Sequence, residues 1–460
     1  MSLSSTLSLR AAIAILFFAA IGGNARAETI EIFPSAVASC DEEFVAVAKN
    51  LKPGDELVLH EGTYSQPCRR IIQVNGLPDR PVIIRAAENS RPIMTRAANA
   101  RGLNNLEIVN SSFLVVRGLH FRGGNTGVRI TGGSHITIED CEISETLNNG
   151  MLISGANADF LIVRRNHIHH TGLYRGGPTE GEGIYVGCHD RSCRVSRSLF
   201  EGNYIHHLRA TSNGGNDGIE IKPASYGNII RDNVIHDTNI GTRYPCIFVY
   251  GGGAEANIVE GNAVWNCGEG IQVVADAVIR NNIVANCGVA GITVAPHAAN
   301  RRMENVTIVN NTIVGHPTCV HIRWGGGSSL IFANNAAYCA GGEAISATGL
   351  ADKGVTLSAN FVEGLLDGVK AGRGEFIVGG KVDANFVSPA DFDFWPRPKS
   401  ALIGVAARAF APPSDFNNKP RGRPATDVGA YDAGKLSSNP GWKIVPGFKG
   451  GNALTGDGEK

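Results

Sequence analysis

Glu220 and Lys222 are the pair of residues whose types and spacing are best suited to chemistry. They lie two positions apart in the stretch 218–222, where isoleucines alternate with them. This alternation predicts a short β-strand with one buried face, so both charged side chains share the other face. A carboxylate beside an amine could transfer a proton or bind a cation.

Aromatic and polar residues are expected to surround this pair. Neighbouring strands of the same type carry Tyr185, Phe248 and Tyr250 on the equivalent face. Aromatic faces stack on sugar rings, and charged groups bind sugar carboxylates. We therefore predict that Tyr185 and Phe248 bind an acidic polysaccharide. Arg175 and His189 are expected to contribute from adjacent loops. The alternative is a solvated ion pair with the aromatic residues packed under loops.

Three acidic residues suggest a cation site beside the same strand. Glu182 and Asp217 each precede a short strand, at the end of the longest insertions in the chain, and Glu220 lies on the strand itself. Carboxylate oxygens are preferred ligands of Ca²⁺. We therefore expect these three residues to bind calcium. Long loops gathered on consecutive strands of a compact repeat are usually functional.

A sequence repeat defines the elements that must position these residues. Each copy reads apolar-x-apolar-x-x-Asn-x-apolar and is followed by a short strand that starts with glycine or cysteine. The recurring asparagines are Asn166, Asn203, Asn233, Asn262, Asn282, Asn311 and Asn335. One copy cannot cover its own apolar face, so the copies must stack as parallel strands along a coil. The sequence predicts an all-β fold, a single-stranded right-handed parallel β-helix, in which the stacked amides form a structural ladder.

The ends of the chain differ from the repeat. Residues 28–100 are predicted to form an N-terminal cap and the first coils, with a short amphipathic helix at 43–51 over the open end. Residues 101–350 are predicted to form the β-helix core. Sequence rich in Pro and Gly then predicts C-terminal coils and a cap over 351–432, followed by a disordered tail over 433–460.

Residues 1–27 are predicted to be a signal peptide. An apolar run from Ala11 to Ile21 follows Arg10, and Ala25 and Ala27 match the small-x-small pattern of a cleavage site. We expect cleavage near Ala27, a periplasmic or secreted mature protein, no membrane insertion and a monomer. Lys plus Arg and Asp plus Glu both number 42, so a nucleic-acid partner is not expected.

The cysteines are even in number, which permits disulfides in an oxidising compartment. The suggested pairs are Cys40–Cys68, Cys188–Cys193, Cys267–Cys287 and Cys319–Cys339. The last two pairs each lie one repeat apart, so their members could instead stack in the core as small buried residues. Their spacings do not resemble those of a zinc site.

Histidines form two further columns when the repeat is aligned. The first column holds His169, His206, His236 and then Trp265, and the second holds His170, His207 and Asp237. Imidazoles at this spacing could bind a transition metal or transfer protons. A repeat protein also stacks identical residues by default, so a structural role is the alternative.

Motifs near both ends resemble those of secreted right-handed parallel β-helix proteins of the pectate lyase-like superfamily. The stretch 52–59, with 62–64 and 81–85, resembles the N-terminal region of the chondroitinase B and alginate lyase family. The stretch 427–431 resembles a closing motif of many bacterial β-helix proteins. These motifs imply the fold more than an activity.

The strand with Glu220 and Lys222, followed by Ser225 and an Asn-containing turn, resembles that lyase family more specifically. In the family such a lysine is the Brønsted base and nearby acidic residues bind calcium. Family 9 pectate lyases similarly place a base lysine beside an acidic calcium pocket. The chain departs from the family at 249–251, which reads Val-Tyr-Gly where the family has Arg-His-Gly. Arg243 in the preceding loop is the candidate substitute for the missing arginine.

β-Elimination at a uronate requires a base, a cation to stabilise the enolate, and a proton for the leaving oxygen. Lys222 is the candidate base, and Tyr250 or Tyr185 the candidate proton donor. The pKa of a lysine, ordinarily about 10.4, must fall for it to act as a base. Glu220 alone would stabilise the ammonium, so the hypothesis requires calcium to engage Glu220.

Two alternatives stay open. The first is a non-catalytic polysaccharide-binding or cell-surface protein that uses the same aromatic wall. The second is another enzyme on the same fold. A glycoside hydrolase would need two carboxylates, which Asp217 with Glu220 or Glu182 could supply, and a C5-epimerase would abstract a proton without cleaving the chain.

Overall fold

The computed structural model describes most of the chain. The described residues are 27–35, 43–65, 67–96, 101–211, 214–238, 243–297, 303–372, 374–441 and 443–444. The predicted signal peptide, apart from Ala27, lies outside the described residues. Among the described residues, no helix is long and apolar enough to span a membrane.

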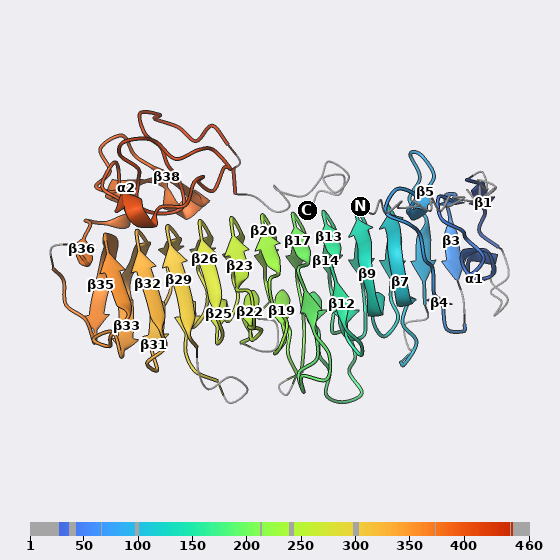
Figure 1. Ribbon diagram of the computed structural model, residues 1–460. Coiled ribbons are helices and arrows are strands. Elements are labelled where there is room, and N and C mark those ends of the chain that lie inside the picture. The colour runs from blue at the N-terminus through green and yellow to red at the C-terminus, as the bar shows by residue number, and fades with distance from the viewer. Residues whose placement is uncertain are drawn as a thin grey trace, which may run out of the picture.

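A single long sheet of parallel strands winds through the described chain (Figure 1). It contains 36 strands, from β1 (Thr29–Ile32) to β36 (Phe376–Val378). Most of these strands pair with strands of both the preceding and the following turn, so the sheet forms an elongated coil. The predicted all-β parallel β-helix is confirmed.

Successive turns superimpose their strands into three faces. The site face consists of β11 (Met151–Ile153), β15 (Ile184–Val186), β19 (Ile219–Ile221), β22 (Ile247–Val249), β25 (Glu269–Val273), β28 (Ala290–Val294) and β31 (Thr318–Arg323). The histidine face consists of β10 (Glu142–Ser144), β14 (His167–His169), β18 (Tyr204–His206), β21 (Val234–His236), β24 (Ala263–Trp265), β27 (Ile283–Ala285) and β30 (Thr312–Val314). The charged face consists of β13 (Ile162–Arg164), β17 (Leu199–Glu201), β20 (Ile229–Arg231), β23 (Asn257–Glu260), β26 (Ala277–Arg280), β29 (Asn305–Val309) and β32 (Ser329–Ala333).

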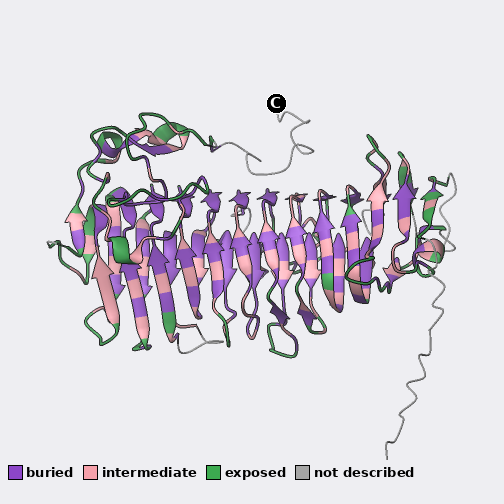
Figure 2. Cartoon of the chain, turned by 45° about the horizontal axis from the view of Figure 1, so that its top comes forward, coloured by how far each residue is buried: buried purple, intermediate pink, exposed green. Residues whose placement is uncertain are grey.

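The turns toward the two ends of the coil include its longest strands. The N-terminal turns include β2 (Glu56–Leu59), β5 (Val82–Ala86), β7 (Leu106–Arg117) and β9 (Val128–Glu139), and the C-terminal turns include β33 (Ala336–Thr348) and β35 (Asn360–Asp367). Alternate residues of the strands point inward, and stacked isoleucines such as Ile184, Ile219 and Ile247 are fully buried. The buried band follows the whole length of the coil (Figure 2). The core therefore grows lengthwise with each added turn.

The repeated asparagines form the predicted ladder. The side-chain amide of Asn203 donates to the Oδ1 of Asn233 at 2.9 Å, and that of Asn233 donates to Asn262 at the same distance. Each Oδ1 also accepts the backbone N–H of the asparagine one turn earlier, as in the 2.9 Å bond from Asn203 to Asn233. The ladder runs from Asn166 to Asn360, which is one turn further than the predicted set. It satisfies buried backbone groups that the bends of the coil would otherwise leave unpaired.

A column of alternating charge lies on the charged face and the strands before it. In register order the residues are Arg117, Glu139, Arg164, Glu201, Arg231, Glu260 and Arg280. The closest ion pairs, each at 2.6 Å, join Arg164 to Glu139, Arg231 to Glu201 and Arg280 to Glu260. Every basic residue in this column therefore has an acidic residue on an adjacent turn.

The N-terminal helix α1 spans Glu43–Ala48 and is shorter than the predicted 43–51. Phe44 and Ala48 are buried and pack into the core of the coil. This packing explains why the helix forms, because a short helix has little stability of its own. Its function as a cap over the open end stays a prediction.

The C-terminal segment packs along the histidine face. It contains α2 (Val382–Asn385) and the antiparallel pair β37 (Phe386–Ser388) and β38 (Asp393–Pro396). A second hydrophobic cluster joins Trp395 and Tyr431 of this segment to Trp265 and Tyr338 of the coil. Figure 1 shows the segment lying over the last turns. Buried Ile444 belongs to the same cluster, so the packed chain continues past the predicted boundary at residue 432.

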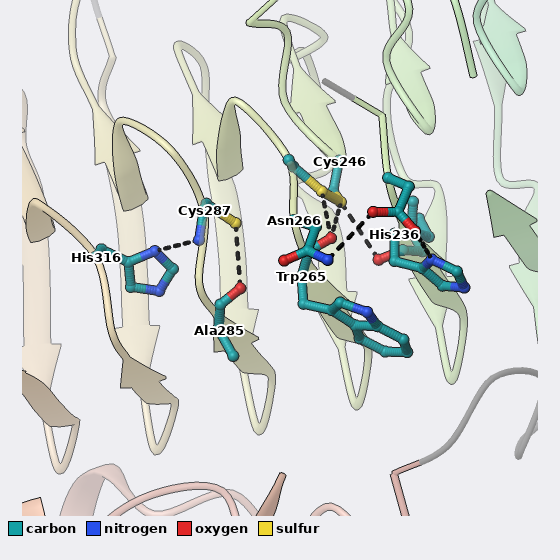
Figure 3. The surroundings of a disulfide bond; sticks show 10 residues. His236, Cys246, Trp265, Asn266, Ala285, Cys287 and His316 are labelled. Atoms are coloured by element: carbon teal, nitrogen blue, oxygen red, sulfur yellow. Dashed lines mark hydrogen bonds and ion pairs between the residues drawn. A yellow bond between two sulfur atoms is a disulfide. The ribbon is translucent and has the colours of Figure 1, made fainter. Parts of the chain in front are cut away.

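Two predicted disulfides, Cys188–Cys193 and Cys319–Cys339, are confirmed. The predicted Cys267–Cys287 pair is wrong, because Cys267 is bonded to Cys246 of the preceding turn. Cys287 is a buried free thiol, with its Sγ 3.6 Å from the carbonyl oxygen of Ala285 (Figure 3). Cys68 is disulfide-bonded, and its predicted partner, Cys40, lies outside the described residues.

Candidate active site

Glu220 and Lys222 lie side by side on the site face, as the alternation in their strand predicts. Glu220 is in the middle of β19, in register with Tyr185 on one side and Phe248 on the other. Lys222 directly follows the strand, and its Nζ forms an ion pair with the Oε1 of Glu220. Both side chains are buried, with 9% of Lys222 and 4% of Glu220 exposed. A solvated surface pair is therefore excluded.

The three predicted calcium ligands come together around Glu220 of this pair. Glu182, Asp217 and Glu220 are all buried, and one carboxylate oxygen of each lies within 4.8 Å of the others. Asp217 Oδ1 and Glu220 Oε2 are buried without a hydrogen-bond partner in the described structure. Unsatisfied buried carboxylate oxygens fit a hard cation such as Ca²⁺. The donor set thus agrees with the predicted site.

Charge within this cluster is unbalanced. Burial raises the pKa of both Glu182 and Asp217, and the nearby charge of Glu220 raises each pKa further. Lys222 provides one positive charge for three carboxylates. Removing like charges from water so close together is unfavourable. A bound cation would relieve this repulsion.

Lys222 is held as an ammonium ion while Glu220 is its partner. Burial by itself lowers the pKa of Lys222, but Glu220 and Tyr185 outweigh burial and raise the pKa above its usual value. To act as a base, however, Lys222 must have a lowered pKa and be a neutral amine. This role therefore depends on Glu220 turning from Lys222 toward a cation.

Aromatic rings enclose the ammonium. Nζ of Lys222 lies 4.3 Å from the ring centre of Tyr185 and 5.3 Å from that of Tyr250. Phe248 stacks on Tyr250 with ring centres 3.8 Å apart, and only 4% of Phe248 is exposed. Phe248 thus supports Tyr250 rather than presenting an open ring. Its predicted role in binding substrate stays a prediction.

The three predicted loop residues differ in their contacts with this site. Arg243 is exposed, and in the described structure it forms no ion pair with the acidic cluster. Arg175 is also exposed and donates to the carbonyl oxygens of Gly172 and Tyr174 in its own loop, each at 2.9 Å. Exposed His189 lies edge-on to Tyr250, with ring centres 6.0 Å apart. The roles of these three residues stay predictions.

Three residues of the site were not predicted. Asn149 donates to Glu182 Oε2 at 2.5 Å, and the ring of His297 lies edge-on to Tyr250 at 4.9 Å. Tyr244, next to Arg243, is half-buried; burial raises its pKa, and so do the charges of Asp217 and Glu182. A signal existed for Asn149, because it precedes Gly150 just as Glu182 and Asp217 precede the glycines of their strands.

Comparison with known proteins agrees with the architecture. The family model described as "Right handed beta helix region" matches residues 82–216 and 196–337. The chain therefore belongs to the right-handed β-helix family, which also settles the handedness of the coil. No curated protein matches the sequence.

Solved structures with the same fold include two lyases and an epimerase. The alginate lyase from Paenibacillus sp. str. FPU-7 is 21% identical, with a TM-score of 0.50 over 61% of this chain and 95% of its own. Pectate lyase Pel9A is 14% identical, with a TM-score of 0.52 over 89% and 97%. The A-module of the Azotobacter vinelandii mannuronan C-5 epimerase AlgE4 is 15% identical, with a TM-score of 0.51 over 75% and 96%. At these identities the similarity establishes the fold alone.

Proposed function

We propose that this protein is a lyase that cleaves a uronate-containing polysaccharide by β-elimination, with Lys222 as the base. One observation carries the proposal: a buried lysine lies beside three buried carboxylates, between aromatic rings on the outer wall of a β-helix. The similarity in fold to an alginate lyase and a pectate lyase supports this class of substrate.

Glu182, Asp217 and Glu220 are the residues that would bind Ca²⁺. When bound, the ion would supply positive charge for the carboxylate of the substrate as the enolate forms. Loss of the field of Glu220 would let burial dominate at Lys222, so the lysine pKa would fall toward the working pH. Lys222 could then remove the proton next to the uronate carboxylate.

Two tyrosines could return a proton to the leaving oxygen. Burial raises the pKa of Tyr185 to about 12 and raises the pKa of Tyr250 as well. Both phenols are therefore protonated at neutral pH. Tyr250 is the preferred donor, because Phe248 packs against its ring and fixes its position.

A panel of uronate polymers tests the reaction. The purified protein is incubated with each polymer in Ca²⁺ or in chelator, and ultraviolet absorbance of unsaturated sugar ends is recorded. Absorbance that requires Ca²⁺ and is lost in Lys222→Ala supports the lyase. The matched control is Lys353→Ala, which removes an exposed lysine outside the site.

Other outcomes would replace the lyase proposal. New reducing ends without unsaturated sugars would indicate a hydrolase that uses two of the carboxylates. A changed uronate composition without cleavage would indicate a C5-epimerase. Binding of a polymer without turnover would indicate a carbohydrate-binding protein.

We also propose that the chain is exported, with cleavage near Ala27. The disulfides support this location, since such bonds persist mainly in oxidising compartments. N-terminal sequencing of protein recovered from the periplasm and the medium of an expressing bacterium tests the idea. A mature N-terminus at Glu28 is expected, whereas an intact Met1 in the cytoplasm would contradict it.

A further inference from the structure

The histidine face contains a second group of potential ligands, on a different face of the coil from Lys222. Strands β14, β18 and β21 end in His169, His206 and His236, which lie in register. The residue after each strand folds its side chain back onto that histidine. The Nδ1 atoms of His206 and His207 lie 2.6 Å apart, and Nδ1 of His236 lies 2.7 Å from Oδ2 of Asp237.

Backbone conformation explains this folding back. His170, His207 and Asp237 all have a φ of 52°, in the left-handed region. Asn, Asp and His are the non-glycine residues that tolerate this region best. The next turn has Asn266 at the same place, with a φ of 51°. The position after each of these strands thus holds a polar side chain that contacts either its own histidine or, as with Asn266, the preceding turn.

Stacking holds the rings of successive turns over one another. The rings of His206 and His236 are 5.2 Å apart and 7° from parallel, and Trp265 stacks on His236 at 4.6 Å. This register brings ligand atoms of His207, His236 and Asp237 within 4.8 Å of one another. Two consecutive turns therefore contribute to one group.

Neighbouring side chains orient these ligands. Asn266 donates its amide to Asp237 Oδ1 at 3.2 Å, and the hydroxyl of Tyr204 lies 3.1 Å from Nε2 of His236. Figure 3 shows His236 and Asn266 on adjacent turns. If the Nε2–H of His236 donates a hydrogen bond to the Tyr204 oxygen, the lone pair of Nδ1 is left for a ligand. Support of this kind around a histidine is typical of metal sites.

We propose that His207, His236 and Asp237 bind a divalent transition-metal ion, with Zn²⁺ as the best fit to two imidazoles and a carboxylate. The ion replaces the proton shared by Nδ1 of His236 and Oδ2 of Asp237, and that proton is released to solvent. A tetrahedral site needs its ligand atoms about 3.3 Å apart. The 2.7 Å contact must therefore widen by about 0.6 Å, which a small rotation of the His236 ring would provide.

A second histidine group on the same face is less suitable. His167, His169 and His206 also lie within 4.8 Å of one another, but they contribute no negative charge. Arg91 forms an ion pair with Glu142, whose Oε1 lies 3.3 Å from Nε2 of His169. The guanidinium therefore lies close to this group and disfavours a second cation. Asp237 gives the proposed site the anionic ligand that the other group lacks.

Metal binding to the intact protein tests the proposal. Chelator-treated protein is titrated with Zn²⁺, with calorimetry and Tm as readouts, and with Co²⁺ as a visible-absorbing substitute. The expected result is a single tight site, a rise in Tm with Zn²⁺ and a Co²⁺ spectrum of low coordination number. Asp237→Asn and His207→Asn should each weaken Zn²⁺ binding at least about tenfold. Both keep a residue that tolerates a positive φ, so both should fold.

The control is His170→Asn, which makes the same substitution one turn away and should retain the Zn²⁺ site. No rise in Tm and no Co²⁺ spectrum would overturn the proposal. Equal loss of binding in His170→Asn and Asp237→Asn would also overturn it, because binding would then belong to the histidine columns in general. Loss in His169→Gln with retention in Asp237→Asn would assign the metal to the other group.

Discussion

At the scale of single residues, Glu220 controls the state of Lys222. The two side chains are buried together, and their ion pair keeps the lysine protonated. An acidic group that binds either the lysine or a cation, but not both, would couple activity to the cation. The same carboxylates are unfavourable partners for one another when no cation is bound.

Asp217→Asn should therefore separate stability from cation binding. In chelator at neutral or slightly alkaline pH, we expect the variant to be more stable than the natural protein by about 1 kcal/mol, because one buried like charge is removed. Urea unfolding with and without Ca²⁺ measures the effect. Ca²⁺ should stabilise the natural protein and have little effect on the variant. A less stable variant in chelator would show that Asp217 has a stabilising partner.

His316 makes acid stability dependent on a buried imidazole. Its Nδ1 accepts the backbone N–H of Cys287 at 2.9 Å (Figure 3), and its Nε2 lies 3.2 Å from the carbonyl oxygen of Val284. Burial lowers the pKa of His316 to about 4, against about 6.5 in an unfolded chain. Between these values the unfolded chain binds more protons than the folded one, so stability falls as pH falls.

We expect up to about 3 kcal/mol of stability to be lost through His316 between pH 6.5 and pH 4. The variant His316→Gln cannot titrate and should show a shallower pH dependence, whatever its stability at neutral pH. Urea midpoints measured across this range give the two slopes. Identical slopes would mean that His316 does not contribute to acid sensitivity.

At the scale of elements, the asparagine ladder fixes the bends of the coil. Asn233 accepts from the backbone N–H of Asn203, donates to the carbonyl oxygen of Phe200 and also donates to Asn262. Its loss would leave buried backbone groups unpaired on the preceding turn. We expect Asn233→Ala to lower the free energy of unfolding by about 2–4 kcal/mol.

Hydrogen exchange can locate this effect. Amides of the turns around residues 203 and 233 should exchange faster in Asn233→Ala, while the N-terminal turns stay protected, because each turn contacts only its neighbours. Uniformly faster exchange along the coil would instead indicate that the solenoid unfolds as one unit. Unchanged stability would show that water replaces the amide.

The sequence was sufficient to predict elements that depend on local pattern. Strand register follows from two-residue alternation and the ladder asparagines, which is why Tyr185, Glu220 and Phe248 could be aligned correctly. The acidic cluster also followed from a repeated position, the residue before each strand. Periodicity says nothing about how loops fold, and so it could not predict that Asp217 and Glu182 raise the pKa of Tyr244.

The cysteines illustrate the same limit. Spacings of one turn are alike for Cys246–Cys267 and Cys267–Cys287, so sequence separation cannot decide between them. The pairing depends on which neighbouring cysteine points its side chain toward Cys267, and in the structure this is Cys246.

At the scale of the whole molecule, the C-terminal segment stabilises the last turns from outside the coil. Fully buried Trp395 and Phe416 contact the same hydrophobic cluster as Tyr338. The C-terminal segment packs against the side of the coil, so this contact does not depend on the asparagine ladder inside the coil. A substitution that unfolds the C-terminal segment should therefore leave the N-terminal half of the coil folded.

Trp395→Ala should cost about 3–5 kcal/mol locally, as truncation of a large buried aromatic residue does. We expect limited proteolysis of the variant to cleave within 382–444 first, while fragments with the Lys222 strand persist. Mass spectrometry of the fragments gives the order of cleavage. Simultaneous loss of both regions would show that the segment is essential to the entire coil.

The column of alternating charge restricts how the coil can gain or lose turns. Duplicating or deleting a single turn between Glu139 and Glu260 would bring like charges together at the junction. Duplicating or deleting two turns would leave the alternation intact. The hydrophobic core has a period of one turn, whereas this charged column has a period of two. Insertions and deletions that this region tolerates are therefore expected to comprise two turns at a time. The alternating charges, and not the hydrophobic core, determine this step.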